Sequence, residues 1–299
     1  MQSSLLLILG LALIFIVLFI GPNLLVAYLR NNINFIKYIN NFSLIQYYCQ
    51  SGLCIVEYIN GSITWIAINK TNPTNPGVGV IIPRGTNYTG IKAYFCVYKA
   101  EPALGIPLSP ITNNYNDHKS KGLALIPGYS IQLNAWLKAM NGSWYWVQDV
   151  LLITSYNNEN VVEPLWCVLK FNGTITCNEV SVRQELRYPM CGTLTIIYLP
   201  SNETLTLYFN NTEISTIKVY MKRFGLADVT LVGISNYQGV QFDYLNATLS
   251  LWLLKGNSWA APSNLQWMHA GYWTGEYING VSTVIKSYNM VFIITNSTK

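Results

Sequence analysis

Alternating hydrophobic and polar positions dominate the chain after about residue 40, and this pattern predicts β-strands. Segments of Val, Ile, Leu, Tyr and Trp recur, separated by short stretches rich in Pro, Gly and Asn, as in proteins built from many short antiparallel strands. No amphipathic helix of substance is found beyond the N-terminal segment. The pattern predicts an all-β fold, a β-sandwich or jelly roll made of one or two packed sandwiches, after one N-terminal hydrophobic helix.

The N-terminal segment is an apolar run over residues 5–29, interrupted at Gly21-Pro22-Asn23. The part before the interruption has the length of a signal-peptide core, whereas the whole run can span a membrane as one helix of about 20 residues. A cleaved signal and a retained anchor both remain open for residues 1–29. We expect a linker or helix extension over residues 30–45 and an extracellular β-sandwich region over residues 46–299.

Composition narrows the class of protein further. The 299 residues are 51% hydrophobic and only 10% charged, whereas ordinary soluble domains carry about 25% charged residues. These values exclude a disordered chain, a coiled coil and a helical repeat. The net charge is +5 and no basic cluster exceeds Lys222-Arg223, so we expect no binding to nucleic acid.

Ten Asn-x-Ser/Thr sequons occur in the sequence, where chance predicts roughly four. They indicate a glycosylated exterior, with Asn-rich turns as the alternative explanation. The candidate glycosylation sites are Asn41, Asn60, Asn69, Asn87, Asn141, Asn172, Asn202, Asn210, Asn246 and Asn296.

The six cysteines also indicate an oxidising exterior, so we expect a secreted or membrane-anchored extracellular protein. No spacing matches a zinc site, and we expect neither a metal nor a cofactor. Six cysteines allow fifteen pairings, so the connectivity stays open. The pairing that the spacing favours is Cys49–Cys54, Cys167–Cys177 and Cys96–Cys191.

A hairpin centred on Asn141-Gly142 carries the chemistry of most interest. Asn-Gly favours a two-residue turn, and such a turn places Ala135 opposite Gln148 and puts Gln148 on one face with Trp146. An amide there is either a core group satisfied by hydrogen bonds or part of an aromatic-walled groove. Asp149 falls on the opposite face, and a one-residue change of register would exchange the faces.

This hairpin resembles the thermopsin family, the secreted acid peptidases of thermoacidophilic archaea. The similarity covers residues 129–134 and the segment Asn141-Gly142-Ser143-Trp144-Tyr145-Trp146-Val147-Gln148-Asp149-Val150. Weaker similarity follows over residues 249–263 and at Thr274-Gly275-Glu276, where the family tends to show a small residue and then an acid. The resemblance spans about residues 80–295 and implies a β-rich acid endopeptidase.

Carboxyl groups are the candidate catalytic groups. Only His118 and His269 are present, no Gly-x-Ser-x-Gly elbow accompanies them, and the cysteines pair off evenly. Near pH 3 a histidine cannot act as a base, so an acid-active hydrolase uses carboxyls, with amides as partners. The chain offers only four Asp and nine Glu, which keeps the search short.

We predict that Gln148 and Glu276 form the catalytic pair, by analogy with glutamic peptidases, which also use a β-sandwich. The carboxylate would activate water and the amide would stabilise the oxyanion. Asp149 is the rival carboxyl and Asp243 a third candidate, while a plain surface acid is the alternative interpretation of Glu276. The aromatic residues expected to line the groove are Trp144, Trp146, Trp252 and Trp273.

A second class of function remains open beside the peptidase. In it the chain is a non-catalytic cell-surface glycoprotein that serves carbohydrate binding, adhesion or envelope structure. The peptidase requires a peptide or protein substrate and a carboxyl near a second carboxyl or amide. The binding protein requires only an aromatic groove for glycans, with its acids scattered elsewhere. In both cases the N-terminal segment is the expected contact with the membrane.

Overall fold

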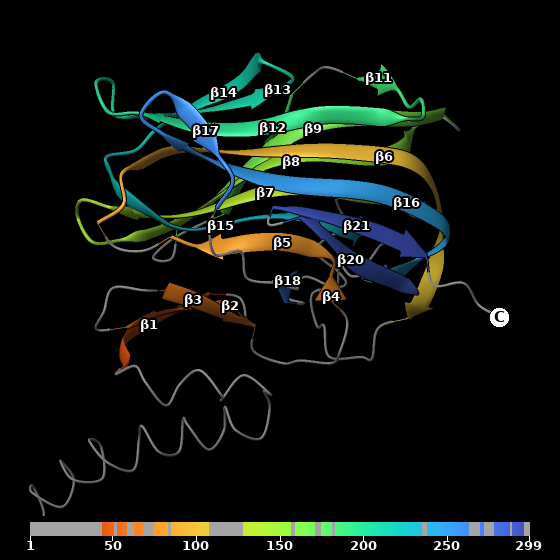
Figure 1. The fold of residues 1–299 in the computed structure, drawn as a ribbon, viewed down its shortest axis with the longest axis horizontal. Coiled ribbons are helices and arrows are strands. Elements are labelled where there is room, and N and C mark those ends of the chain that lie inside the picture. Colours follow the sequence, from red (N-terminus) through yellow and green to blue (C-terminus); the bar gives the residue numbers. More distant parts are fainter. Residues whose placement is uncertain are drawn as a thin grey trace, which may run out of the picture. The chain divides into compact units, whose positions relative to one another are not determined.

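Strands form nearly all of the structure, a computed structural model of the chain (Figure 1). Two compact units are found, residues Met1–Ile45 and Gln46–Lys299. The predicted N-terminal helix lies outside the described residues, and within those residues no helix is long and apolar enough to cross a membrane. The described residues are 44–50, 53–58, 63–67, 74–82, 85–107, 128–156, 159–170, 175–180, 183–234, 238–262, 270–271, 278–287 and 289–295.

Sheet I has seven strands, and its described pairs are antiparallel. Its path runs β10-β9-β8-β7-β15-β5, and β11 pairs with β9. The strands are β5 (Gly77–Ile81), β7 (Gly128–Ala139), β8 (Trp144–Tyr156), β9 (Glu159–Lys170), β10 (Ile175–Glu179), β11 (Gln184–Glu185) and β15 (Met221–Ile234).

Sheet II has eleven strands, with the path β14-β13-β12-β6-β16-β19-β4-β18, and its longest members are β6 and β16. Strand β19 runs parallel to β16, whereas β6, β17 and β21 pair with β16 antiparallel. The strands are β4 (Thr74–Asn75), β6 (Tyr88–Pro107), β12 (Met190–Leu199), β13 (Thr204–Phe209), β14 (Thr212–Lys218), β16 (Gln238–Lys255), β17 (Ser258–Ala260), β18 (Ala270–Gly271), β19 (Ile278–Asn279), β20 (Val281–Ser287) and β21 (Met290–Thr295).

A third sheet of three strands precedes these two, in the order β1 (Leu44–Gln50), β2 (Leu53–Tyr58) and β3 (Ile63–Ala67). Strands β2 and β3 pair antiparallel, and Asn60-Gly61 lies between them in the sequence. Asn279-Gly280 joins β19 to β20, which pair with other strands instead of with each other.

The hydrophobic core lies between sheets I and II, which confirms the predicted β-sandwich (Figure 1). Alternate residues of β7 face it, and Ile131, Leu133 and Leu137 are all 0% exposed. Across the interface the rings of Tyr129 and Phe242 meet edge to face, with 5.7 Å between centroids. Burying one such side chain stabilises the fold by about 1.5–3 kcal/mol, so the shared core holds the sheets together.

The β7–β8 hairpin differs from the sequence prediction by one position in register. Asn134, not Ala135, lies opposite Gln148. The amide of Gly142 donates to the carbonyl of Ala139, the amide of Ala139 donates to the carbonyl of Ser143, and Gly142 has φ of +87°. The loop thus holds three residues and ends in a left-handed glycine, a geometry as compatible with Asn-Gly as the two-residue turn. The predicted register was wrong, and the faces of β7 are exchanged relative to β8.

Gly142 is expected to be the residue on which this turn depends. A left-handed backbone costs an L-amino acid about 1–2 kcal/mol, and no neighbouring atom lies within 4 Å of an added Cβ. Gly142→Ala should therefore lower the free energy of unfolding by about 1 kcal/mol through the backbone alone. Gly142→Asn should cost less, since Asn tolerates this conformation. Urea unfolding compares the two variants, and equal losses would contradict the explanation.

Two disulfides are described, and each joins residues directly opposite each other on neighbouring antiparallel strands. Cys96 of β6 pairs with Cys191 of β12, and Cys167 of β9 pairs with Cys177 of β10. Both predicted pairings are confirmed and are compatible with an extracellular protein. The side chains of the third predicted pair, Cys49–Cys54, lie outside the described ones.

Four sequon asparagines expose their side chains, namely Asn87, Asn141, Asn202 and Asn210, so these sites are open to a glycan. Asn246 differs, because it is half-buried and its Oδ1 is enclosed. The sequon asparagines whose side chains are outside the described ones are Asn41, Asn60, Asn69, Asn172 and Asn296.

Candidate functional site

A row of polar side chains crosses the outer face of sheet I, which is turned away from the core. Asn134 of β7 lies between Asp228 of β15 and Gln148 of β8 in the strand register. Gln132 lies two residues along β7 on the same face. Three adjacent strands thus supply these four side chains, which we call the amide–carboxyl cluster.

Hydrogen bonds connect the amide–carboxyl cluster into one chain. Asn134 Nδ2 donates to Asp228 Oδ1 at 2.7 Å. Gln148 Nε2 donates both to Asn134 Oδ1 and to Gln132 Oε1, at 2.9 Å in each case. Gln132 Nε2 donates to Ser130 Oγ at 2.9 Å. A buried carboxyl is therefore linked through three amides to a hydroxyl.

Two tryptophans on the same face fix the direction of these bonds. Trp146 Nε1 donates to Asn134 Oδ1 at 3.1 Å, and an indole N–H can only donate. The oxygen of Asn134 must then face Trp146 and Gln148, which turns its Nδ2 toward Asp228. The ring of Trp136 stacks on that of Trp146 with 5.5 Å between centroids and 15° between planes, which holds the indole in place.

Gln148 positions Asn134 in this structure. A glutamine amide has two N–H donors, and both are used, one on Asn134 and one on Gln132. Donation to an oxyanion would break one of these bonds. The predicted oxyanion role of Gln148 thus requires a rearrangement of these hydrogen bonds. In the structure its amide is a buried group whose donors are satisfied by its neighbours.

Asp228 is the carboxyl of the amide–carboxyl cluster, and the sequence reasoning did not single it out. Its side chain is only 4% exposed. Burial raises the pKa of Asp228 to about 7, and the hydrogen bond from Asn134 opposes part of this rise. A single acid within the apolar strand Leu226–Leu231 was the signal available in the sequence. A buried carboxyl with a strongly shifted pKa is a typical mark of a functional site.

Asp149 lies on the inner face of β8, inside the core between the sheets. It is 0% exposed, and its Oδ2 accepts the backbone N–H of Thr195 at 3.1 Å. Its Oδ1 has no hydrogen-bond partner in the described part of the chain. Burial raises the pKa of Asp149 well above its ordinary value. Strand β8 itself separates Asp149 from Gln148, as the alternation of side chains predicts.

The other predicted catalytic groups do not join the amide–carboxyl cluster in the described residues. Glu276 lies outside those residues, so its pairing with Gln148 stays a prediction. His118 and His269 also lie outside them. Asp243 is exposed on β16, which belongs to sheet II. Among the described residues no group of three or more His, Cys, Asp or Glu is placed to hold a metal ion.

The predicted groove aromatics fall on two different sheets. Trp144 and Trp146 are buried on the outer face of sheet I, with exposed fractions of 0% and 7%. Trp252 lies on the outer face of sheet II, because its neighbours Leu251 and Leu253 belong to the core. Outer faces of a sandwich point in opposite directions, so these residues do not share a groove. Trp273 lies outside the described residues.

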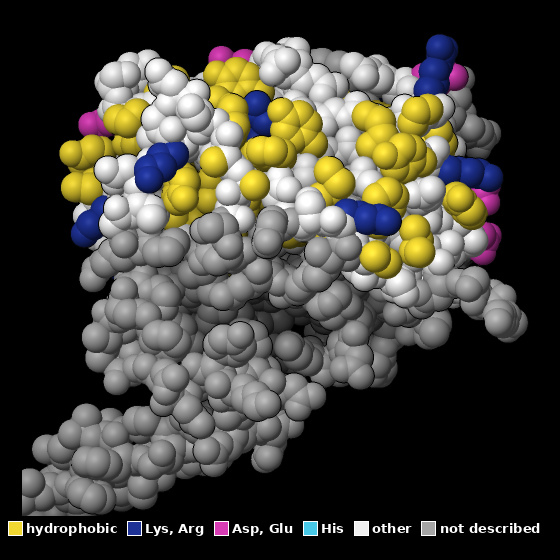
Figure 2. Space-filling view, viewed as in Figure 1, with side chains coloured by type: hydrophobic (Ala, Val, Ile, Leu, Met, Phe, Trp, Pro, Cys, Tyr) yellow, Lys and Arg dark blue, Asp and Glu magenta, His cyan; other side chains and the backbone are white. Residues whose placement is uncertain are grey.

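Sheet II instead presents an exposed aromatic cluster around Lys92. The Lys92 ammonium lies 4.3 Å from the ring centroid of Trp259 and 5.8 Å from that of Tyr94, and Tyr94 meets Trp252 edge to face at 6.1 Å. Tyr94 is 47% exposed. Figure 2 shows hydrophobic side chains in separate groups with Lys and Arg between them, and the acidic side chains near the margin.

No protein-family model matches the sequence, and a search of curated protein sequences finds no significant match. Among solved structures, the chain is similar to the β-porphyranase BpGH16B of Bacteroides plebeius, with 11% identity and a TM-score of 0.21, over 60% of this chain and 55% of that one. It is also similar to the kappa-carrageenase of Pseudoalteromonas carrageenovora, with 11% identity, a TM-score of 0.26 and 85% of each chain covered. A heptameric SAP-like pentraxin of Limulus polyphemus gives 7% identity and a TM-score of 0.27, over 69% of this chain and 94% of that one. Similarities this low transfer neither activity nor ligand to the present chain.

Proposed function

We propose that this chain is an extracellular acid endopeptidase of the thermopsin type, with Asp228 as its proton donor and Glu276 as the second carboxyl. One observation carries the proposal. The hairpin that resembles thermopsins holds Asn134 and Gln148, and Asn134 hydrogen-bonds Asp228, a buried carboxyl whose pKa is raised to about 7. An acid next to amides on one sheet face is the grouping that carboxyl-based hydrolysis needs.

The two carboxyls have different roles in this proposal. At pH 2–4 Asp228 keeps its proton, because its pKa is far higher. Glu276 is assigned the role of the base: in its ionised form it takes a proton from water as the water oxygen attacks the peptide carbonyl carbon. Asp228 gives its proton to the peptide nitrogen as the C–N bond breaks, which yields a carboxylic acid and an amine. Carboxyls with pKa values pushed apart are the pattern of an acid–base pair.

Access to the amide–carboxyl cluster sets a condition on this chemistry. Asp228 and Asn134 are each 4% exposed, and Gln148 is 7% exposed. Because these side chains are buried, a peptide reaches them only if the residues that cover the outer face of sheet I move aside. Enclosure also strengthens electrostatic interactions within the site, because water is excluded.

Asp228→Asn is expected to lower casein digestion at pH 2–4 by at least about 100-fold, the usual contribution of a general acid. An amide has the shape of the neutral carboxyl, so the variant should stay folded at acid pH. Asp243→Asn is the matched control, since that carboxyl is exposed on sheet II, and it should keep full activity. Digestion is followed with purified protein, with and without pepstatin.

Glu276→Gln should also abolish acid proteolysis while the protein remains folded by circular dichroism. Full activity in this variant would show that Glu276 has no role in the mechanism. Full activity in Asp228→Asn would show that the amide–carboxyl cluster has no role in it. A folded wild-type protein that digests no casein at pH 2–4 refutes the peptidase altogether.

The exposed cluster around Lys92 favours a second candidate function, carbohydrate binding at a cell surface. Tyr94, Trp252 and Trp259 offer ring faces and edges beside a cation, and aromatic rings of this kind suit stacking against sugars. An inactive wild-type protein that is retained on an insoluble polysaccharide would favour this function over the peptidase.

A further inference from the structure

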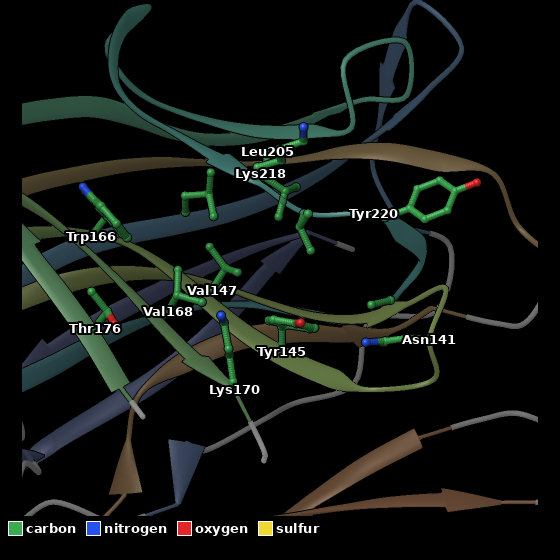
Figure 3. A pocket seen from close by; sticks show the side chains of 13 residues that line it. Asn141, Tyr145, Val147, Trp166, Val168, Lys170, Thr176, Leu205, Lys218 and Tyr220 are labelled. Atoms are coloured by element: carbon green, nitrogen blue, oxygen red, sulfur yellow. The ribbon is translucent and has the colours of Figure 1, made fainter. Parts of the chain in front are cut away.

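A pocket of about 500 Å³ opens between the two sheets at one margin of the sandwich (Figure 3). Tyr145, Val147 and Lys170 line it from sheet I, and Leu205 and Lys218 line it from sheet II. Its size falls within the range of about 300–1,000 Å³ that is usual for small-molecule sites. It lies on the inner side of sheet I, so it is separate from the amide–carboxyl cluster on the outer side.

Aliphatic side chains form the deep part of this inter-sheet pocket. Val147, Val168 and Leu205 line it and are 1%, 6% and 0% exposed. They belong to the hydrophobic core and lie on β8, β9 and β13. An apolar floor of this kind favours a ligand with a hydrophobic body, because each apolar Å² removed from water contributes about 25 cal/mol.

Aromatic rings surround the more open part. Tyr145 and Trp166 are half-buried and Tyr220 is 57% exposed, although all three line the inter-sheet pocket. Aromatic rings beside an apolar cavity offer a large contact area to a ligand. Flat ring faces favour a ligand body that is itself a ring.

The charges of the inter-sheet pocket are all positive. Lys170 and Lys218 line it, and no Asp or Glu is among the lining residues. The ion pairs found in the described part of the chain join other residues, namely Lys99–Glu101, Arg183–Glu163 and Arg187–Glu185. The ammonium of Lys170 lies 6.0 Å from the ring centroid of Tyr145. Two ammonium groups with no acid among the residues that line the pocket give it a preference for an anion.

We propose that the inter-sheet pocket binds a small organic anion with an apolar, ring-shaped body and one carboxylate. The body packs on Val147, Val168 and Leu205 between the aromatic side chains. The carboxylate meets one ammonium group at the margin of the pocket, that of Lys170 or that of Lys218, which Figure 3 shows well apart, and the other adds to the positive potential. This site does not rest on the proposed peptidase, because it shares none of its residues.

Calorimetric titration of the deglycosylated protein tests the proposal with three probes. Deglycosylation is needed because Asn141, a sequon residue, also lines the inter-sheet pocket. The probes are 2-naphthoate, its neutral analogue 2-naphthalenemethanol, and glucuronate, an anion with a polar ring. Naphthoate should bind at least about tenfold more tightly than either of the others, and its affinity should fall with added salt.

Variants then assign the charge to the two lysines. Lys170→Met and Lys218→Met keep the aliphatic stems, and each should weaken naphthoate binding up to about fivefold, as expected for exposed ion pairs. The double variant should lose about tenfold or more. Lys255→Met is the matched control, because Lys255 is exposed and does not line the inter-sheet pocket.

Thr176→Trp adds a test of location, since Thr176 is exposed and lines the inter-sheet pocket. The larger side chain should block naphthoate binding while the melting temperature stays unchanged. The proposal is overturned by equal affinity for naphthoate and the neutral alcohol, by tightest binding of glucuronate, by undiminished binding in the double variant, or by no binding of naphthoate at millimolar concentration.

Discussion

The free energy of unfolding is expected to fall by several kcal/mol as the pH rises from about 4 to 7. Asp149 and Asp228 are 0% and 4% exposed, and burial raises the pKa of both carboxyls in the folded protein. In the unfolded chain both titrate near 3.9. Between pH 4 and the folded pKa the native state therefore binds more protons than the unfolded state, and stability falls as the pH rises.

Replacing Asp149 or Asp228 by asparagine separates the contributions of the two carboxyls to the pH dependence of stability. Asp228→Asn should be nearly neutral at pH 3 and should stabilise the protein at pH 7 by on the order of 4 kcal/mol, since its folded pKa is about 7 and each pKa unit corresponds to about 1.4 kcal/mol. Asp149→Asn should act in the same direction. Asp243→Asn, at an exposed carboxyl, should change little at either pH.

Denaturant unfolding at pH 3, 5 and 7 measures these differences. Wild-type stability that increases from pH 4 to pH 7 would contradict the expected sign. A pH dependence that survives in the Asp149→Asn, Asp228→Asn double variant would place its origin in other groups.

Removing the Cys96–Cys191 disulfide is expected to have the second large effect. The bond spans 95 residues in the sequence, and closing a loop of about 100 residues stabilises a protein by roughly 4.7 kcal/mol in the chain-entropy description. The double variant Cys96→Ala, Cys191→Ala should lose about this amount. Because it joins β6 to β12 in the middle of sheet II, the loss is expected to show as one cooperative transition at lower denaturant concentration.

The Cys167–Cys177 disulfide is the matched control. It spans only 10 residues, and a loop of 15 residues is worth about 3 kcal/mol on the same basis. The double variant Cys167→Ala, Cys177→Ala should therefore lose clearly less than the first. A loss as large as that of the long loop would show that local packing, and not loop length, decides the effect of each bond.

The sequence was sufficient to predict the sandwich, because alternation is a local signal, whereas the disulfide pairing stayed open among fifteen possibilities until the structure placed the strands. Apolar residues at every second position, as at Ile131, Leu133 and Leu137, specify one buried face in an antiparallel sheet. Cys167 and Cys177 lie on either side of the Asn172-Gly173 dipeptide in the sequence, and the strands that carry them pair antiparallel. The pairing of Cys96 with Cys191 was a choice by elimination that also assumed the Cys49–Cys54 pair.

The candidate site was less accessible to sequence reasoning, since it depends on register and on long-range strand order. Asn-Gly is compatible with loops of two or three residues, and the difference decides whether Gln148 faces Asn134 or the core. Asp228 reaches Asn134 only because β15, distant in the chain, lies next to β7. No local pattern encodes that neighbour.

Loop length at residues 140–142 has a consequence for which insertions and deletions the protein tolerates. Surface loops usually accept a gained or lost residue. Here a single deletion would shift β8 by one position against β7, turn Gln148 into the core and bring Asp149 to the outer face. The length of this exposed turn is therefore expected to be as strictly constrained over evolutionary time as the side chains of the amide–carboxyl cluster themselves.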